Sequence, residues 1–180
     1  MKSNSRFSIL LFVFLVLPSV EVDAGALGFG RKSQVHLSPE VRGRIFLNGD
    51  PVYGATVIRT LDYDQEYREE TVTGENGAFY FPEEAILSNR PGRLLDETRV
   101  RQIVTVHHEG QRYILWYHTP GGISQRSAVS SRLKNMICEL RTPEKELLFR
   151  NLDNPEFPHA AFSICRWDDG LEMQSIDDIL

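Results

Sequence analysis

Hydrophobic and polar residues alternate in Val41–Leu47, a period of two that is typical of a β-strand with one buried face. Asn48 and Gly49 follow directly, and this pair favours a tight hairpin turn because both residues tolerate positive φ. Small, β-compatible residues then occupy positions 54–60. The pattern therefore predicts two strands joined by a short turn.

The next segments continue the β pattern. Residues 62–73 alternate charged residues with Tyr67 and Val72, which indicates a solvated edge strand that charge protects from mispairing. Residues 78–81 carry Phe79 and Phe81 at period two and precede a proline, so they predict a short core strand.

The richest β-forming segment follows. Residues 100–107 and 112–118 predict a second hairpin around Glu109 and Gly110. The unbroken apolar and aromatic run at 113–117 indicates burial on both faces, or one core face and one functional face. Residues 132–140 fit a helix or a strand, residues 144–150 a further short element, and residues 163–167 a last strand. Two prolines make residues 151–159 a predicted loop.

Residues 41–81 resemble the carboxypeptidase regulatory-like module, a transthyretin-like β-sandwich. The likeness rests on Val-x-Gly at 41–43, Pro-Val-x-Gly-Ala-x-Val at 51–57, a glycine-bearing turn at 74–77 and Phe-x-Phe at 79–81. The whole chain is similar to an uncharacterised family of secreted bacterial proteins built on that module. The resemblance implies an all-β fold, a transthyretin-like antiparallel β-sandwich, and the cysteines predict a disulfide-stapled C-terminal extension. It implies no reaction, because function depends on a site.

The same resemblance implies which residues face inward. In the module, Ile45, Val57, Phe79 and Phe81 alternate onto one face, so we expect them to form the core. The likeness also favours a strand from about Met136 within the ambiguous segment.

The N-terminus predicts a secretory signal peptide over residues 1–24. Lys2 and Arg6 form a basic start, an apolar run covers residues 7–17, and small residues precede a cleavage position at Ala24/Gly25. The run is too short for a membrane anchor, which needs about 20 apolar residues. We therefore expect a periplasmic or secreted protein with no stable membrane span after processing.

The rest of the chain predicts one domain. Residues 25–39 are interpreted as a flexible lead-in, residues 40–167 as a single β-sandwich domain with its extension, and residues 168–180 as a loose acidic tail. The formal net charge of −5 argues against nucleic acid and against a polybasic membrane contact.

Cys138 and Cys165 are the two cysteines of the chain. An even number in an exported protein favours a disulfide, and two buried free thiols are the alternative. No Cys-x-x-Cys or His-x-x-x-His spacing indicates a metal site. Neighbouring His107 and His108 would face opposite sides of a strand, so solvated strand-end histidines, His118 included, are the preferred interpretation.

No motif predicts catalysis or a cofactor. The chain has no Gly-x-Ser-x-Gly elbow, phosphate loop or dinucleotide fingerprint. An enzyme branch of the transthyretin-like fold ends in Tyr-Arg-Gly-Ser, whereas this chain ends in Asp-Asp-Ile-Leu.

Two groups of residues are candidates for binding. The first is a local arginine cluster that could take a carboxylate or phosphate, or simply neutralise Asp96 and Glu97: Arg90, Arg93, Arg99 and Arg101. The second consists of aromatic residues that could contact a partner or build the core: Tyr113, Trp116, Tyr117 and Trp167.

The leading hypothesis is an exported, non-enzymatic binding module. It would recognise a protein or cell-envelope partner through a β-face or an edge strand. The alternative is a small periplasmic hydrolase or ligand carrier with a pocket near the loop of residues 90–101. A flat aromatic face would favour the first, and a polar pocket with convergent histidine, arginine and carboxylate groups would favour the second.

Overall fold

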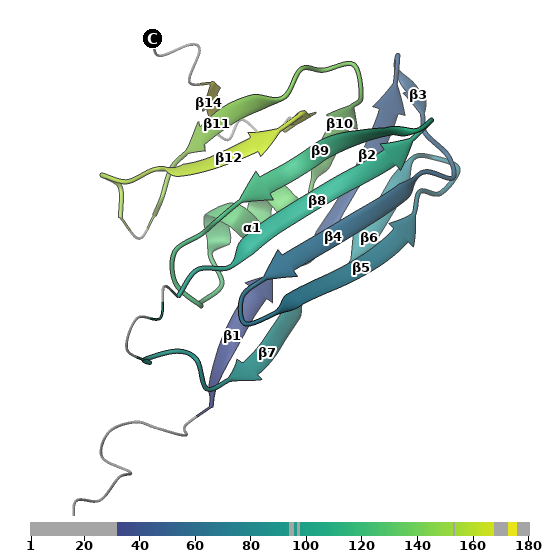
Figure 1. Ribbon diagram of the computed structural model, residues 1–180. Coiled ribbons are helices and arrows are strands. Elements are labelled where there is room, and N and C mark those ends of the chain that lie inside the picture. Colours follow the sequence, from purple (N-terminus) through teal and green to yellow (C-terminus); the bar gives the residue numbers. More distant parts are fainter. Residues whose placement is uncertain (1–31, 94–95, 97, 153, 168–172, 176–180) are drawn as a thin grey trace, which may run out of the picture.

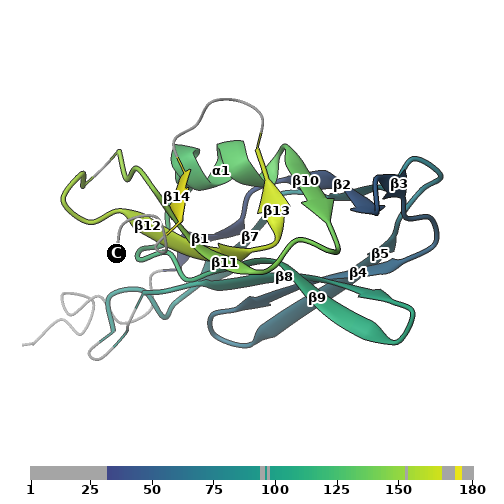
Figure 2. The same cartoon turned by 90° about the horizontal axis from the view of Figure 1, so that it is seen from above.

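The computed structural model describes residues 32–93, 96, 98–152, 154–167 and 173–175. As the alternating pattern predicts, its regular structure is almost entirely β-strand, arranged in two layers (Figures 1 and 2). The predicted signal peptide lies outside the described residues, as does most of the predicted acidic tail. Within the described part, no helix is long and apolar enough to cross a membrane.

One layer is a seven-stranded antiparallel sheet, called here the large sheet, in the order β14-β11-β12-β9-β8-β4-β5. The predicted hairpin around Glu109 and Gly110 is confirmed as β8–β9, and the predicted charged edge strand is confirmed as β5. The strands of the large sheet are β4 (Thr56–Asp62), β5 (Glu66–Val72), β8 (Arg101–His108), β9 (Gln111–His118), β11 (Lys145–Phe149), β12 (His159–Ser163) and β14 (Met173–Ser175). Residues 173–175 of the predicted loose tail thus form a strand paired with β11.

The other layer is a five-stranded sheet, called here the small sheet. It has the order β13-β10-β2-β3, and β6 also pairs with β2. Its strands are β2 (Val41–Leu47), β3 (Asp50–Pro51), β6 (Ala78–Phe81), β10 (Met136–Glu139) and β13 (Cys165–Arg166). Asn48 and Gly49 form the predicted turn, both with positive φ. The turn leads into the short β3, however, whereas the strand predicted at 54–60 is β4 of the large sheet.

A further pair of strands corrects the predicted lead-in. Residues 33–38 are not a flexible segment but β1 (Ser33–Ser38), which pairs with β7 (Glu84–Ser88). Val35 and Leu37 of β1 are fully buried in a second, smaller core with Leu61, Tyr63 and Val100. Burial of these two apolar side chains explains why the segment is ordered despite its polar composition.

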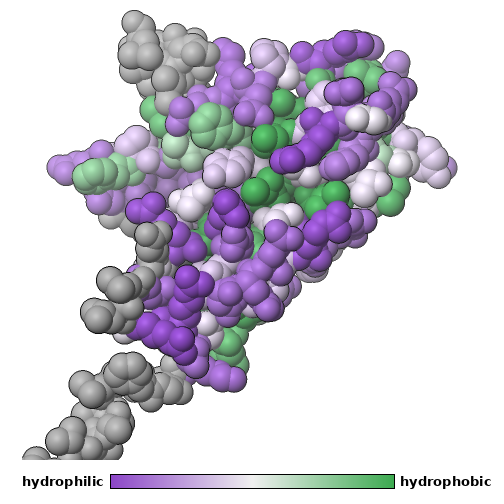
Figure 3. Space-filling model, viewed as in Figure 1, coloured by the Kyte–Doolittle hydropathy of each residue, from purple (hydrophilic) through white to green (hydrophobic). Residues whose placement is uncertain are grey.

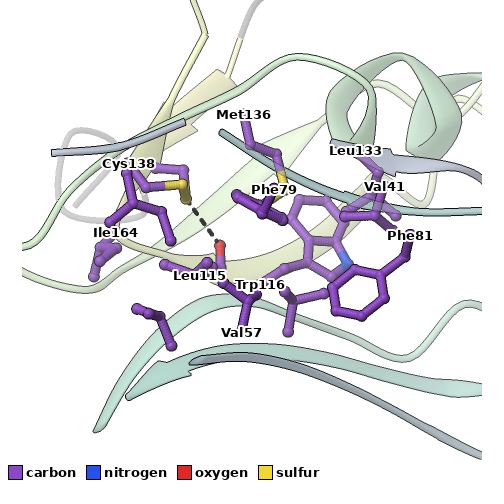
Figure 4. Close-up of a cluster of buried hydrophobic side chains, with 14 of the residues drawn as sticks. Val41, Val57, Phe79, Phe81, Leu115, Trp116, Leu133, Met136, Cys138 and Ile164 are labelled. Carbon is purple, nitrogen blue, oxygen red and sulfur yellow. Dashed lines mark hydrogen bonds between the residues drawn. A yellow bond between two sulfur atoms is a disulfide. The ribbon is translucent and has the colours of Figure 1, made fainter. Parts of the chain in front are cut away.

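The main core lies between the two sheets. Figure 4 shows side chains from both layers converging there, with Trp116 and Leu115 of the large sheet facing Phe79 and Met136 of the small sheet. The predicted core residues are confirmed, because Ile45 and Val57 are 0% exposed, Phe81 2% and Phe79 4%.

A parallel pairing completes the small sheet. β10 runs parallel to β2 with Met136 opposite Gly43. A Cβ atom at Gly43 would lie only 2.5 Å from the Met136 carbonyl oxygen, so glycine is required for this close approach.

The predicted disulfide between Cys138 and Cys165 is confirmed. The two residues are directly opposite each other in β10 and β13, with their Cα atoms 4.0 Å apart. The covalent bond therefore joins an edge strand to the interior of the small sheet. A disulfide is compatible with an extracellular or periplasmic protein.

The ambiguous segment contains both kinds of structure. The helix α1 (Ser127–Leu133) ends just before the strand, and β10 begins at Met136 as predicted. Val129 and Leu133, one helical turn apart, are buried in the main core. The Arg132 guanidinium lies 4.6 Å from the centre of the Phe149 ring, which ties the helix to the large sheet.

Candidate interaction surface

The four aromatic residues predicted to bind a partner lie in different environments. Trp116 is 0% exposed, so its predicted role in a contact surface is wrong. Tyr113 and Trp167 are partly buried and pack against the main core. Of the four, Tyr117 is the one that faces away from the core.

A register shift in the β8–β9 hairpin explains this distribution. Val104 pairs with Trp116 but Thr105 pairs with Ile114, which leaves Leu115 as an extra residue in β9. Such a bulge lets two consecutive side chains turn inward, and Leu115 and Trp116 are both fully buried. Alternation resumes afterwards and directs Tyr117 outward.

The outer face of the large sheet carries a group of apolar side chains, called here the outer apolar patch. Ile103 lies opposite Tyr117, and Tyr117 lies opposite Phe162 on the next strand. Figure 3 shows apolar residues gathered in the middle of this face and hydrophilic residues around them. The patch consists of Ile58, Ile103, Ile114, Tyr117 and Phe162.

The patch is partly exposed. The rings of Tyr117 and Phe162 meet edge to face with their centroids 6.0 Å apart, and Phe162 is 37% exposed. Ile58 and Ile114 both lie opposite Thr105, which joins the isoleucines into one surface. Contiguous exposed apolar surface of this kind is typical of a protein–protein contact.

Charged pairs border the patch. Arg68 forms an ion pair with Glu70 along the β5 edge, and Arg101 forms one with Asp62 at the end of β4. Both pairs are partly exposed, so they contribute little to stability. They surround the apolar centre with charges of both signs.

A pocket of about 340 Å³ lies beside one end of the patch, near the loop that the sequence singled out. Arg99 and Arg101 line it, together with Arg90 and Tyr117. Arg93 is not among the lining residues, and its Nε donates a hydrogen bond to the Asn89 carbonyl oxygen at 2.9 Å. The predicted arginine cluster is therefore only partly brought together.

Most of the charge in this pocket is neutralised locally. Arg90 Nε lies 3.2 Å from Asp96 Oδ1, and Arg101 pairs with Asp62. Burial raises the pKa of Tyr63, and the negative charge of Asp96 raises it further. Arg99 is exposed and forms no ion pair within the described residues.

The histidines do not converge. His107 is exposed on the outer face, as predicted, but His118 is buried on the inner face and corrects the prediction of a solvated side chain. Burial lowers the pKa of His118 to about 4, with smaller contributions from His159 and Arg126. The neutral ring has its Nδ1 2.7 Å from the Ala160 carbonyl oxygen, to which it donates. In the described part of the chain, no group of three metal-ligating side chains could hold an ion.

Sequence reasoning missed four of the five patch residues. Ile58, Ile103 and Ile114 occupy outward positions in strands that also carry inward apolar residues, and Phe162 lies in a segment with little apolar pattern. The sequence signal that could have found these residues is that neighbouring strands carry apolar side chains at outward as well as inward positions. The strand order, which places these residues together, is not visible in the sequence.

Comparison with known protein families shows that a family described as a domain of unknown function, DUF6795, matches residues 41–143. The match begins with β2 and ends shortly after β10. It therefore covers the β4–β5 and β8–β9 hairpins but not β11, β12 or β14. No curated protein matches the sequence significantly.

Proposed function

We propose that this protein, which belongs to the family described as domain of unknown function DUF6795, is an exported, non-enzymatic module that binds a partner protein through the outer apolar patch. The observation that carries the proposal is the patch itself, five apolar side chains in contiguous positions on four strands. The resemblance to the carboxypeptidase regulatory-like, transthyretin-like module supports an exported β-sandwich. So does the disulfide, which suits a periplasmic or secreted protein.

The chemistry of the patch favours a partner with an apolar surface of its own. Tyr117 and Phe162 supply large apolar area with few rotatable bonds, which is the character of interface hot spots. The ion pairs at the border would exclude water and set orientation. A partner strand adding to β5 is less favourable, because the charged residues of that strand protect its edge.

The experiment is affinity capture followed by cross-linking on the folded protein. A photoreactive residue in place of Thr60, which is partly exposed and lies opposite Ile103, should cross-link to one defined partner. The double substitution Ile103→Ser/Tyr117→Ser should abolish that cross-link while circular dichroism stays unchanged.

Tyr53 provides the matched control, since it is 71% exposed and lies outside the patch. Tyr53→Ser should leave capture intact. Capture that survives the double substitution would contradict the proposal, and so would a cross-link to a second copy of this chain alone.

The arginine pocket supports a second candidate, a carrier of a small anionic ligand. Its volume of about 340 Å³ suits a small molecule, and Arg99 presents an exposed cation beside Tyr117. Citrate should then raise the melting temperature of the protein but not that of Arg99→Ala. Equal shifts in the two proteins would exclude this candidate. A reproducible hydrolytic activity lost on changing His107 or His118 alone would instead favour an enzyme.

A further inference from the structure

The outer face of the small sheet, on the opposite side of the core from the outer apolar patch, contains a groove of about 530 Å³. Gly43, Phe79 and Met136 line it and lie side by side on three neighbouring strands. Phe79 and Met136 direct their side chains into the core, so the backbone forms the floor. The groove therefore runs across the strands rather than along them.

The walls of the groove are the residues on either side of that row. Arg42 and Tyr80 lie opposite each other on one wall. Arg44 lies between Ala78 and Ile137 on the other wall. Tyr80 is 55% exposed and Ile137 39% exposed, so an aromatic and an aliphatic side chain accompany the two arginines.

Cations without acidic partners concentrate on this face. Lys134 lines the groove and Arg166 continues the wall beside Ile137. Within the described residues, Arg44, Lys134 and Arg166 form no ion pair, although the chain as a whole carries a net charge of −5. The charge of this face is thus positive, whereas the net charge of the whole chain is negative.

One of the two carboxylates near the groove pairs with Arg42 and the other is held by the β2–β3 turn, so neither neutralises Arg44, Lys134 or Arg166. Glu40 lies 3.3 Å from Arg42 Nε. Glu139 accepts hydrogen bonds from the backbone N–H groups of Asn48 and Gly49, both at 3.0 Å, and so holds the β2–β3 turn. Burial acts to raise the pKa of Glu139, but these N–H groups and that of Arg141 outweigh it and keep the pKa below its usual value.

We propose that this groove binds an acidic polysaccharide of the uronic acid class. Arg42 and Arg44 are two residues apart on one strand, which separates their Cα atoms by roughly 6.5–7 Å. A carboxylate held between them can accept charge-assisted hydrogen bonds from both guanidinium groups. Tyr80 offers the face of its ring to the adjoining sugar.

The pairing of β2 argues against an acidic peptide bound by strand addition. A peptide bound by strand addition needs free backbone donors and acceptors at a sheet edge. β2 pairs with β10 on one side and with β6 on the other, so the floor of the groove has no such edge to offer. A polysaccharide has no peptide groups to satisfy, and its hydroxyl groups can stay in contact with water.

Native affinity electrophoresis of the whole folded protein tests the proposal, with alginate in the gel as the polyuronate. Migration should slow as alginate is added, and dextran, a neutral polymer, should have no effect. Arg44→Ala should weaken the apparent affinity roughly tenfold, on the scale of one charge-assisted hydrogen bond. Tyr80→Ala should weaken it as well.

Arg112→Ala is the matched control, because Arg112 is an exposed arginine at the far end of β9 on the outer face of the large sheet. It removes the same charge and should leave alginate binding unchanged. An equal loss in Arg112→Ala and Arg44→Ala would show general charge attraction and overturn the proposal. Equal retardation by polyglutamate would indicate an acidic protein as the ligand, and binding to anionic phospholipid vesicles in place of alginate would indicate a membrane. Either result would overturn it.

The proposed polysaccharide site is independent of the proposed partner site. The double substitution Ile103→Ser/Tyr117→Ser should leave alginate binding intact, and Arg44→Ala should leave partner capture intact.

Discussion

The two faces of the large sheet are both apolar at their centres, yet they have different surroundings. On the inner face, the Trp116 ring lies 6.0 Å from the Phe149 ring and 6.1 Å from the Trp167 ring, all within the protein. On the outer face, Tyr117 has Phe162 beside it at 6.0 Å and solvent in front of it. Consecutive residues of one strand thus belong to a packed interior and to an open surface.

Hydrophobic character alone therefore does not decide whether a residue stabilises the fold or contacts a partner. An inner residue loses contacts and leaves a cavity when it is shortened, so the free energy of unfolding falls. An outer residue loses mainly exposed area, so the stability of the isolated protein changes little and the effect appears in binding. Substitutions on the two faces should separate these effects.

The largest effect is expected for Trp116→Ala. Removal of this fully buried ring should lower the free energy of unfolding by roughly 3–5 kcal/mol, measured by urea denaturation. Phe79→Ala, on the facing sheet, should cost a similar amount. A loss below about 1 kcal/mol would show that the inner face is loosely packed.

The next largest effect is expected for loss of the Cys138–Cys165 disulfide in the small sheet. The double substitution Cys138→Ser/Cys165→Ser should lower the free energy of unfolding by about 3–4 kcal/mol, the loop-closure value for this separation. Denaturation in the presence and absence of reductant would measure it. Because the change also buries two hydroxyl groups, Cys138→Ala/Cys165→Ala is the control, and stability unaffected by reductant would refute the role of the bond.

A smaller effect on stability is expected from the protonation of His118, the buried histidine. Burial lowers the folded-state pKa of His118 from 6.5 to about 4, so the unfolded chain binds its proton first as the pH falls. Stability should therefore decrease below about pH 6.5, by roughly 2 kcal/mol between pH 7.5 and pH 5. His118→Asn should flatten this dependence. His36→Asn is the comparison, because burial also lowers the pKa of His36. An unchanged dependence of stability on pH in His118→Asn would contradict the prediction.

The smallest effect is expected on the outer face. Tyr117→Ser should change the free energy of unfolding by less than about 1 kcal/mol. The same denaturation experiment used for Trp116→Ala measures it. A loss as large as that of Trp116→Ala would remove the distinction between the two faces and place Tyr117 in the core.

The strands that alternate strictly were predictable from the sequence. Ile45 and Val57 are buried where period two places them, and the Glu109–Gly110 turn joins β8 to β9. Alternation failed in β9, because the bulge at Leu115 moves Trp116 to the inner face and the sequence contains no mark of it. β1 was missed for another reason, since its two apolar residues become buried against Leu61, Tyr63 and Val100, which are distant in sequence.

The candidate sites depend even more on pairing. Ile103, Tyr117 and Phe162 come from three strands, and their proximity requires the strand order of the large sheet. The groove on the small sheet likewise requires β10 beside β2, a pairing between segments more than 80 residues apart. Local patterns could identify outward positions such as Arg42 and Arg44 but not what lies beside them.

The parallel pairing of β2 with β10 has a consequence for the order in which the chain acquires its structure. β4 and β5 are joined by a short turn, as are β8 and β9, so each of these hairpins can form as soon as it is synthesised. β2 must wait for Met136 before its second edge is covered, and a contact between such distant segments forms slowly because a long loop has to close. Until then, the edge of β2 that β10 later covers is open and able to pair with another chain. The interval between synthesis of β9 and arrival of β10 is therefore when the growing chain is most exposed to misassembly.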